Sequence, residues 1–232
     1  MSTLFTCKGL AKSYDKVHAL DGLDLTIQSG RIVGLLGPNG SGKTTLLKLA
    51  NGLLVPTAGE VLIDGKAPCQ ETHKLVSYLP DRPSLPQWMT IRQLQDFYAD
   101  FFPDFDRDRC GKMLDQLELP SHRKLKDLSK GNREKVHLVL TMSRQARLYL
   151  LDEPMGGVDP AARDFILETI LQNYDPEATV VIATHLIADV EKILDEVIFL
   201  DQGKVALHTS VDDLRTETGK SVDALFREVF QC

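Results

Sequence analysis

Residues 37–44 are Gly37-Pro38-Asn39-Gly40-Ser41-Gly42-Lys43-Thr44, with the spacing G-x-x-x-x-G-K-T. The apolar run 32–36 before them predicts a buried parallel strand, and residues 45–49 after them predict the start of a helix. A strand, a glycine-rich turn and a helix N-terminus together form an anion site, because backbone N–H groups and the positive helix end point at one place. We expect Lys43 to reach the β- and γ-phosphates of a nucleotide and Thr44 to bind Mg²⁺ through its hydroxyl.

Composition sets limits on the kind of protein. A chain of 232 residues can bury a real core, and its formal charge of −6 argues against nonspecific nucleic-acid binding. No apolar run approaches the roughly 20 residues of a membrane span, and we expect no secretion signal at the N-terminus. The four cysteines are scattered without C-x-x-C spacing, which indicates reduced thiols in the cytosol.

A second apolar strand is predicted over residues 147–151, and it ends in Asp152, Glu153 and Pro154. Carboxylates at the carboxyl end of a parallel strand face the ligand crevice of an α/β sheet. We expect Asp152 to hold Mg²⁺, and Glu153 to orient and deprotonate the attacking water. Many strands end at acidic turns, so this pattern alone is weak evidence for a metal site. It becomes strong evidence because it follows a phosphate loop in the same chain.

A further helix start is predicted at residues 128–132, Leu-Ser-Lys-Gly-Asn, with Ser129 as N-cap. The residues that follow carry apolar side chains at helical spacing. One nucleotide does not need two such helix N-termini from one chain. The second one therefore indicates a site that serves a nucleotide held by another copy of the protein.

These motifs together resemble those of the ATP-binding subunit of an ABC transporter, in order and over essentially the whole chain. Residues 128–132 are similar to the family signature, residues 150–153 to the Walker B strand, residues 156–159 to the D-loop, and His185 to the switch histidine. The resemblance implies catalysis by Glu153, His185 and Lys43, and metal binding by Thr44, Asp152 and Asp81. It implies nucleotide contacts from Tyr14, Gly37, Pro38, Asn39, Gly40, Ser41, Gly42, Lys43, Thr44, Thr45, Ser129, Gly131 and Asp159.

The chain departs from the family pattern at two places. Lys130 replaces the first signature glycine, and it either adds positive charge near the γ-phosphate or points to solvent. Asp81 stands where the family has glutamine. It either adds a carboxylate beside Mg²⁺ or caps the turn that follows. The sequence leaves both pairs of alternatives open.

The expected fold is an α/β P-loop NTPase of the ABC type, with a mainly parallel sheet, an N-terminal antiparallel β subdomain and an inserted helical subdomain. We expect a single ATPase domain over residues 1–232, with residues 1–87 and 147–232 as core and 88–146 as the helical part. The helical part contains aromatic residues at i,i+4 spacing, which either form its core or a groove for a partner helix.

The resemblance implies a subunit that binds and hydrolyses ATP to power a membrane transporter, with ATP and Mg²⁺ as cofactors. Two copies are expected to close head to tail on two ATP molecules. A separate transmembrane subunit is expected to dock near Asp81 and the helical subdomain, which places the protein in the cytoplasm, peripheral on the inner face of the membrane. The C-terminal residues 200–205 and 223–230 are similar to bacterial ABC-2 exporters. The alternatives are an importer subunit and a soluble ABC ATPase that acts in assembly.

Overall fold

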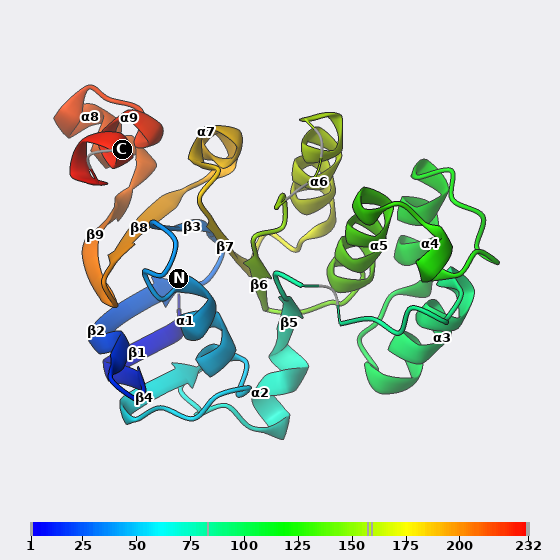
Figure 1. Ribbon diagram of the computed structural model, residues 1–232, viewed down its shortest axis with the longest axis horizontal. Coiled ribbons are helices and arrows are strands. Elements are labelled where there is room, and N and C mark those ends of the chain that lie inside the picture. Colours follow the sequence, from blue (N-terminus) through cyan, green and yellow to red (C-terminus); the bar gives the residue numbers. More distant parts are fainter. Residues whose placement is uncertain (1, 83, 157, 159, 231–232) are drawn as a thin grey trace.

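The computed structural model describes residues 2–230 apart from 83, 157 and 159. Its described strands form two sheets (Figure 1). The smaller sheet is antiparallel and has the order β2-β1-β4. Its strands are β1 (Thr3–Tyr14), β2 (Val17–Gln28) and β4 (Ala58–Ile63). The prediction of antiparallel strands near the N-terminus is thereby confirmed, and β4 joins them from beyond the phosphate loop.

The larger sheet has the order β5-β6-β7-β3-β8-β9, and it is parallel except for the antiparallel pair β8–β9. Its strands are β3 (Ile32–Leu36), β5 (Val76–Leu79), β6 (Leu148–Asp152), β7 (Thr179–Thr184), β8 (Glu196–Asp201) and β9 (Lys204–Ser210). β3 lies between β7 and β8, so the phosphate loop leaves the sheet near its middle. A mainly parallel α/β sheet confirms the predicted fold class.

Three helices follow parallel strands of the larger sheet directly: α1 (Lys43–Ala50), α6 (Pro160–Asn173) and α7 (Ile187–Val190), the last with a 3₁₀ turn at Glu191–Ile193. α2 (Gln70–Leu75) precedes β5, and α8 (Val211–Thr218) and α9 (Val222–Phe230) follow β9. Between β5 and β6 the chain forms α3 (Ile91–Phe101), α4 (Arg107–Gln116), a 3₁₀ turn at Leu125–Asp127 and α5 (Lys130–Met142). This helical segment lies to one side of the sheets in Figure 1.

The larger sheet is covered by apolar side chains on both faces. Along β3, Val33 and Leu35 pack into the core shared with the smaller sheet and α1, whereas Ile32 and Leu36 pack into the core shared with the helical segment. Successive side chains of a strand point to opposite faces. A strand buried on both faces is therefore a continuous apolar run, which explains the composition of residues 32–36 and 148–151.

One buried arginine fixes the helical segment against the sheet. Arg144 is 4% exposed, pairs with Asp104 at 3.1 Å, and donates from Nη1 to the carbonyl oxygen of Val76 at 2.5 Å. Its guanidinium also lies over the ring of Phe102, 4.1 Å from the centroid. Because Val76 begins β5, these contacts set the position of the helical segment relative to the strand that leads to Asp81. Among the described residues, no helix is long and apolar enough to cross a membrane.

Candidate nucleotide site

The turn between β3 and α1 requires glycine at specific positions. Gly42 has φ +108, and a Cβ there would lie 2.4 Å from the carbonyl oxygen of Ala19. A Cβ on Gly37 would lie 2.3 Å from the carbonyl oxygen of Leu200. Both contacts are closer than real Cβ atoms allow, so a side chain at either position would force the backbone to move. The loop is thus packed against β2 and β8 at the N-terminus of helix α1, the end of a helix that favours anions.

Lys43 is held by the loop that it belongs to. Its ammonium donates to the carbonyl oxygens of Gly37 at 2.7 Å and Pro38 at 3.0 Å, and the residue is only 6% exposed. Burial lowers the pKa of Lys43, while Glu153 and Asp152 oppose that shift. The arrangement fixes a cationic group at the start of α1, where a nucleotide phosphate needs a counter-charge.

Asp152 ends β6 and connects that strand to the phosphate loop. Thr44 Oγ1 donates to its Oδ1 at 3.0 Å, and the Tyr78 hydroxyl lies 3.5 Å from Oδ2. Burial raises the pKa of Asp152 to about 6, and the charges of Asp81 and Glu153 add to the shift. A hydroxyl and a carboxylate oxygen at this spacing form the hard-oxygen set that Mg²⁺ takes in phosphate sites.

Glu153 has a backbone conformation that side chains rarely adopt. Its φ is +48, and its N–H donates to the carbonyl oxygen of Ala183 at 2.8 Å. Thr184 Oγ1 donates to Glu153 Oε2 at 3.0 Å, and His185 Nδ1 lies 2.9 Å from Oε1. A non-glycine residue in the left-handed region costs about 1–3 kcal/mol, and such residues cluster at active sites. The strain and the two partners from the end of β7 fix where this carboxylate points.

These groups surround a cleft of about 430 Å³, which we call the carboxyl-end cleft because it lies where the parallel strands end. The described residues that line it are Ala19, Asn39, Gly40, Gly42, Lys43, Thr44, Thr45, Asp81, Glu153, Gly156 and His185. The structure thus brings together the predicted phosphate, catalytic and Asp81 positions. Tyr14 is 44% exposed, and Lys12 Nζ lies 5.3 Å from its ring centroid. Tyr14 is not among the described residues lining the cleft.

The predicted second phosphate site lies apart from this cleft. Ser129 caps α5, and its Oγ accepts from the Asn132 N–H at 3.3 Å, which confirms the predicted N-cap. The Lys130 side chain is 67% exposed, and its Nζ lies 3.7 Å from Glu134 Oε1. Ser129 and Gly131 are absent from the described lining of the carboxyl-end cleft. Asp159, the predicted D-loop residue, lies outside the described residues.

Sequence reasoning missed several neighbours of the site. Thr184 contacts the carboxylate of Glu153, Tyr78 contacts that of Asp152, and Ala19 lines the cleft. The position of Thr184 at the end of a buried strand, next to His185, was a usable signal. Tyr78 gave none, because its contact with Asp152 depends on the pairing of β5 with β6.

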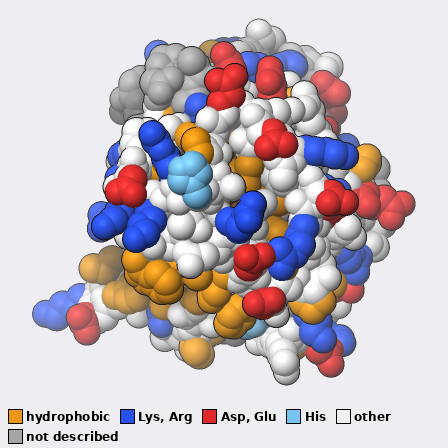
Figure 2. Space-filling view, turned by 90° about the vertical axis from the view of Figure 1, so that its right-hand side faces the viewer, with side chains coloured by type: hydrophobic (Ala, Val, Ile, Leu, Met, Phe, Trp, Pro, Cys, Tyr) orange, Lys and Arg blue, Asp and Glu red, His pale blue; other side chains and the backbone are white. Residues whose placement is uncertain are grey.

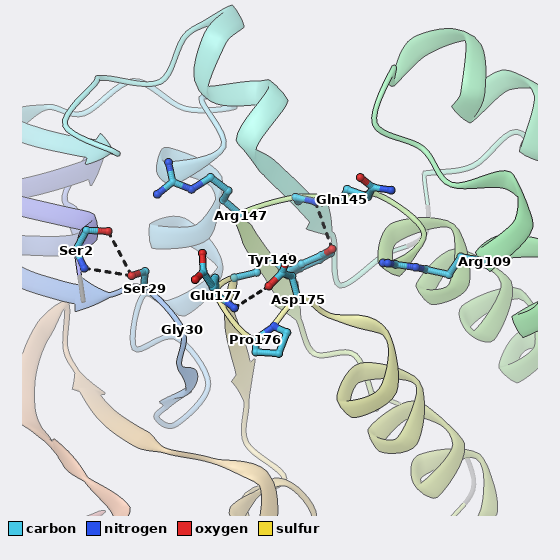
Figure 3. Close-up of a pocket in the computed structure, with 12 residues that line it drawn as sticks. Ser2, Ser29, Gly30, Arg109, Gln145, Arg147, Tyr149, Asp175, Pro176 and Glu177 are labelled. Carbon is cyan, nitrogen blue, oxygen red and sulfur yellow. Dashed lines mark hydrogen bonds between the residues drawn. The ribbon is translucent and has the colours of Figure 1, made fainter.

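A larger cleft of about 830 Å³ lies at the opposite edge of the sheet, and we call it the amino-end cleft (Figure 3). It is lined by segments that precede β3, β6 and β7. Its basic groups are engaged within the chain. Arg147 pairs with Asp64 at 2.7 Å, and Arg109 donates to the carbonyl oxygen of Asn173 at 3.0 Å. The Tyr149 hydroxyl donates to the carbonyl oxygen of Arg144 at 2.5 Å.

Comparisons with known proteins agree with this geometry. The family model described as ABC transporter matches residues 20–156. The chain is 30% identical over 213 residues to the ABC transporter ATP-binding protein YtrB of Bacillus subtilis, covering 90% of this chain and 72% of that protein. It is 28% identical to the daunorubicin resistance ATP-binding protein DrrA3 of Streptomyces coeruleorubidus, covering 99% and 75%.

Solved structures show the same fold. The structure of an ATP-binding subunit of an ABC transporter has a TM-score of 0.88 and 28% identity, and it covers 98% of this chain and 100% of that one. The family match spans more than half of the chain and includes the phosphate loop and the strand ending in Asp152 and Glu153. The chain therefore belongs to the ABC transporter family, as one of its ATP-binding and ATP-hydrolysing subunits.

Proposed function

We propose that the carboxyl-end cleft binds ATP and hydrolyses it with Glu153 as the general base. The observation that carries the proposal is the placement of Glu153 by Thr184 and His185 in the cleft that Lys43 also lines. Glu153 takes a proton from water as the water oxygen attacks the γ-phosphorus, and the bond from that phosphorus to the bridging oxygen of ADP breaks. Lys43 and the loop N–H groups stabilise the charge that develops on the phosphate oxygens.

The other proposed nucleotide contacts come from the phosphate loop and from two residues outside it. Gly37 to Thr45 surround the phosphates, Tyr14 stacks on the adenine, and His185 contacts the γ-phosphate while it holds Glu153. Mg²⁺, when bound by Thr44, Asp152 and Asp81, neutralises phosphate charge. The support for this ligand set is chemical, because it consists of a hydroxyl and carboxylates. No group of three or more His, Cys, Asp or Glu among the described residues forms a protein-only metal site.

We infer that two copies sandwich two ATP molecules head to tail. Ser129 and Gly131 at the capped start of α5 are not among the described residues that line the chain's own cleft, and such a helix N-terminus can serve the nucleotide of a second copy. The γ-phosphate then attracts both helix N-termini, and its loss on hydrolysis opens the dimer. We assign Asp159 to the contact between the two sites.

We further propose that the dimer sits on the cytoplasmic face of a membrane and drives a separate transmembrane subunit, as an exporter. The name of the daunorubicin resistance relative supports export. We also propose that residues 1–232 act as one ATPase domain, with residues 88–146 as its docking subdomain.

An exposed aromatic pair supports docking on the helical segment. Phe101 is 66% exposed and its ring lies tilted against that of Phe97, with ring centroids 4.6 Å apart, and Trp88 is 65% exposed. Figure 2 shows hydrophobic side chains gathered in the lower part of this side of the molecule. By contrast, Tyr98 packs inward on Phe105, with centroids 5.7 Å apart. The aromatic residues therefore divide into a core group and an exposed group, and the exposed group fits a partner helix.

The test is isolation of tagged Glu153→Gln protein from native membranes, solubilised in detergent with ATP and Mg²⁺. We expect a multi-span membrane protein to co-purify in stoichiometric amount, and its identity would establish the substrate and direction. A Phe101→Ser form in the same background is the matched control and should lose that partner while still binding ATP. A purely soluble partner, or none, would contradict the transporter assignment in favour of an assembly ATPase.

A further inference from the structure

A small cavity lies directly behind the catalytic carboxylates. Its volume is about 20 Å³, and the polar residues that line it are Asp81, Glu134, His137, Asp152 and Glu153. Asp81 and Glu153 also line the carboxyl-end cleft, so the two spaces share walls. Glu134 and His137 come from α5, the helix that begins at the signature. The cavity is thus the place where that helix meets the hydrolytic groups of its own chain.

Two polar atoms at this cavity have no hydrogen-bond partner among the described residues. They are Nδ1 of His137 and Oε2 of Glu134, and both atoms are buried. His137 is only 3% exposed, and burial lowers its pKa to about 4, so its ring is neutral near pH 7. A buried polar atom without a partner is costly, and native proteins satisfy nearly all such atoms with protein groups or ordered water. Both residues line the cavity, so a ligand bound in the cavity would supply the hydrogen-bond partner that each atom needs.

The size and chemistry of the cavity suit a water molecule. A cavity of about 20 Å³ is large enough to hold an ordered water, and its lining offers several polar partners. A buried water makes about three hydrogen bonds and can both donate and accept. It can therefore donate to a carboxylate and bond a neutral imidazole nitrogen in either tautomer.

We propose that Glu134 and His137 hold one ordered water against Asp81 and the catalytic carboxylates, and that they act through it as positioning residues for ATP hydrolysis. The inference rests on the proposed role of Glu153. The water would also connect Asp81 and Lys130, the two positions at which the chain departs from the family pattern. Glu134 lines the cavity together with Asp81, and its Oε1 lies 3.7 Å from Lys130 Nζ. A change at the signature can thereby reach the hydrolytic carboxylates of the same chain through one helical turn and one water.

The test compares two substitutions of His137. His137→Leu removes the ring nitrogen, whereas His137→Asn keeps a polar atom near the place of Nδ1. We expect His137→Leu to lower kcat about tenfold while the Kd for ATP stays within about twofold, because the water positions Glu153 without touching the nucleotide. We expect His137→Asn to retain kcat within about threefold of the wild type. If His137 served only in packing, kcat would not be lower in His137→Leu than in His137→Asn.

Thr141→Val is the matched control. Thr141 is buried on the same helix, its hydroxyl donates to the His137 carbonyl oxygen at 2.9 Å, and it does not line the cavity. It should keep the wild-type kcat. Wild-type kcat in His137→Leu, or equal losses in the Leu and Asn variants, would overturn the proposal.

A high-resolution crystal structure of the unmodified protein gives an independent readout that does not require any variant to fold. Density for a water within hydrogen-bond distance of His137 Nδ1 supports the proposal, and a dry cavity overturns it. The failure of the underlying function is separate: it would appear as wild-type turnover in Glu153→Gln. Loss of turnover in Glu153→Gln, together with unchanged kcat in His137→Leu, would reject the positioning role of the water and leave the role of Glu153 intact.

Discussion

The two clefts at opposite edges of the large sheet differ in a way that size does not reveal. The amino-end cleft is about 830 Å³ and the carboxyl-end cleft about 430 Å³. In the larger one, Arg147, Arg109 and Tyr149 are bonded to groups of the chain itself. In the smaller one, the lining residue Glu153 has a strained backbone. The residue before it, Asp152, is a buried carboxylate with a raised pKa.

The difference follows from the direction of the strands. At the carboxyl ends, the loop after β3 leads into the N-terminus of α1, and Asp81, Glu153 and His185, which come soon after β5, β6 and β7, line the same cleft. At the amino ends, the chain enters the sheet, and polar groups are used to fix the loops to one another. The strained backbone of Glu153 therefore identifies the functional cleft better than volume does.

The largest expected effect tests the role of the strained carboxylate. Glu153→Gln keeps the side-chain shape and its contacts with Thr184 and His185 but cannot accept a proton. We expect kcat to fall by about 1000-fold with the Kd for ATP little changed. Single-turnover ATPase assays and equilibrium binding measure the two quantities. Retention of even a tenth of the wild-type turnover, about 1.4 kcal/mol in barrier, would remove Glu153 from the role of general base.

The buried carboxylate of Asp152 predicts a pH dependence of stability. Folding raises its pKa from about 3.9 in an unfolded chain to about 6, chiefly through burial. The folded state therefore binds the proton more tightly, so this stabilisation is complete below about pH 4 and is lost as the pH rises through about 6. In protein free of nucleotide and metal, unfolding free energies of wild type and Asp152→Asn should diverge by about 3 kcal/mol over that range. A pH-independent difference would contradict the raised pKa.

Loss of the loop cation should weaken nucleotide binding. Lys43→Ala removes the ammonium that Gly37 and Pro38 hold at the start of α1. We expect the Kd for ATP to rise about 50-fold, because a charge-assisted contact to phosphate is lost. Titration calorimetry measures this, and ADP serves as a comparison that should show a smaller loss. An unchanged Kd would mean that the loop N–H groups suffice without the lysine.

The smallest effect belongs to the amino-end cleft. Arg147→Ala removes a cation from the larger cleft, as Lys43→Ala does from the smaller one. Its partner is Asp64, and both side chains are more than 40% exposed, so the pair is screened by water. We expect a loss of about 0.5 kcal/mol in stability and a change in ATP affinity within about twofold. An ATP affinity that fell as far as in Lys43→Ala would abolish the distinction between the clefts.

Much of the fold and of the carboxyl-end cleft could be predicted from local patterns. The glycine spacing of residues 37–44, the apolar runs of β3 and β6, and the cap at Ser129 each depend on a few neighbouring residues. The pairing of β4 with β1 could not be predicted, because it joins segments on either side of the phosphate loop. The contacts of Tyr78 with Asp152 and of Thr184 with Glu153 likewise span 74 and 31 residues.

The sequence by itself determined the chemistry of this protein: a phosphate loop, two carboxylates after a buried strand, and a second capped helix start. These are local signals, because backbone conformation and hydrophobic periodicity act over a few residues. Only the tertiary structure decided that Thr44 bonds Asp152, that His185 and Thr184 hold Glu153, and that Glu134 and His137 of α5 lie behind the catalytic carboxylates. Those relations depend on strand order and on helix packing across the sheet, where residues distant in sequence meet by burying apolar surface on both of its faces.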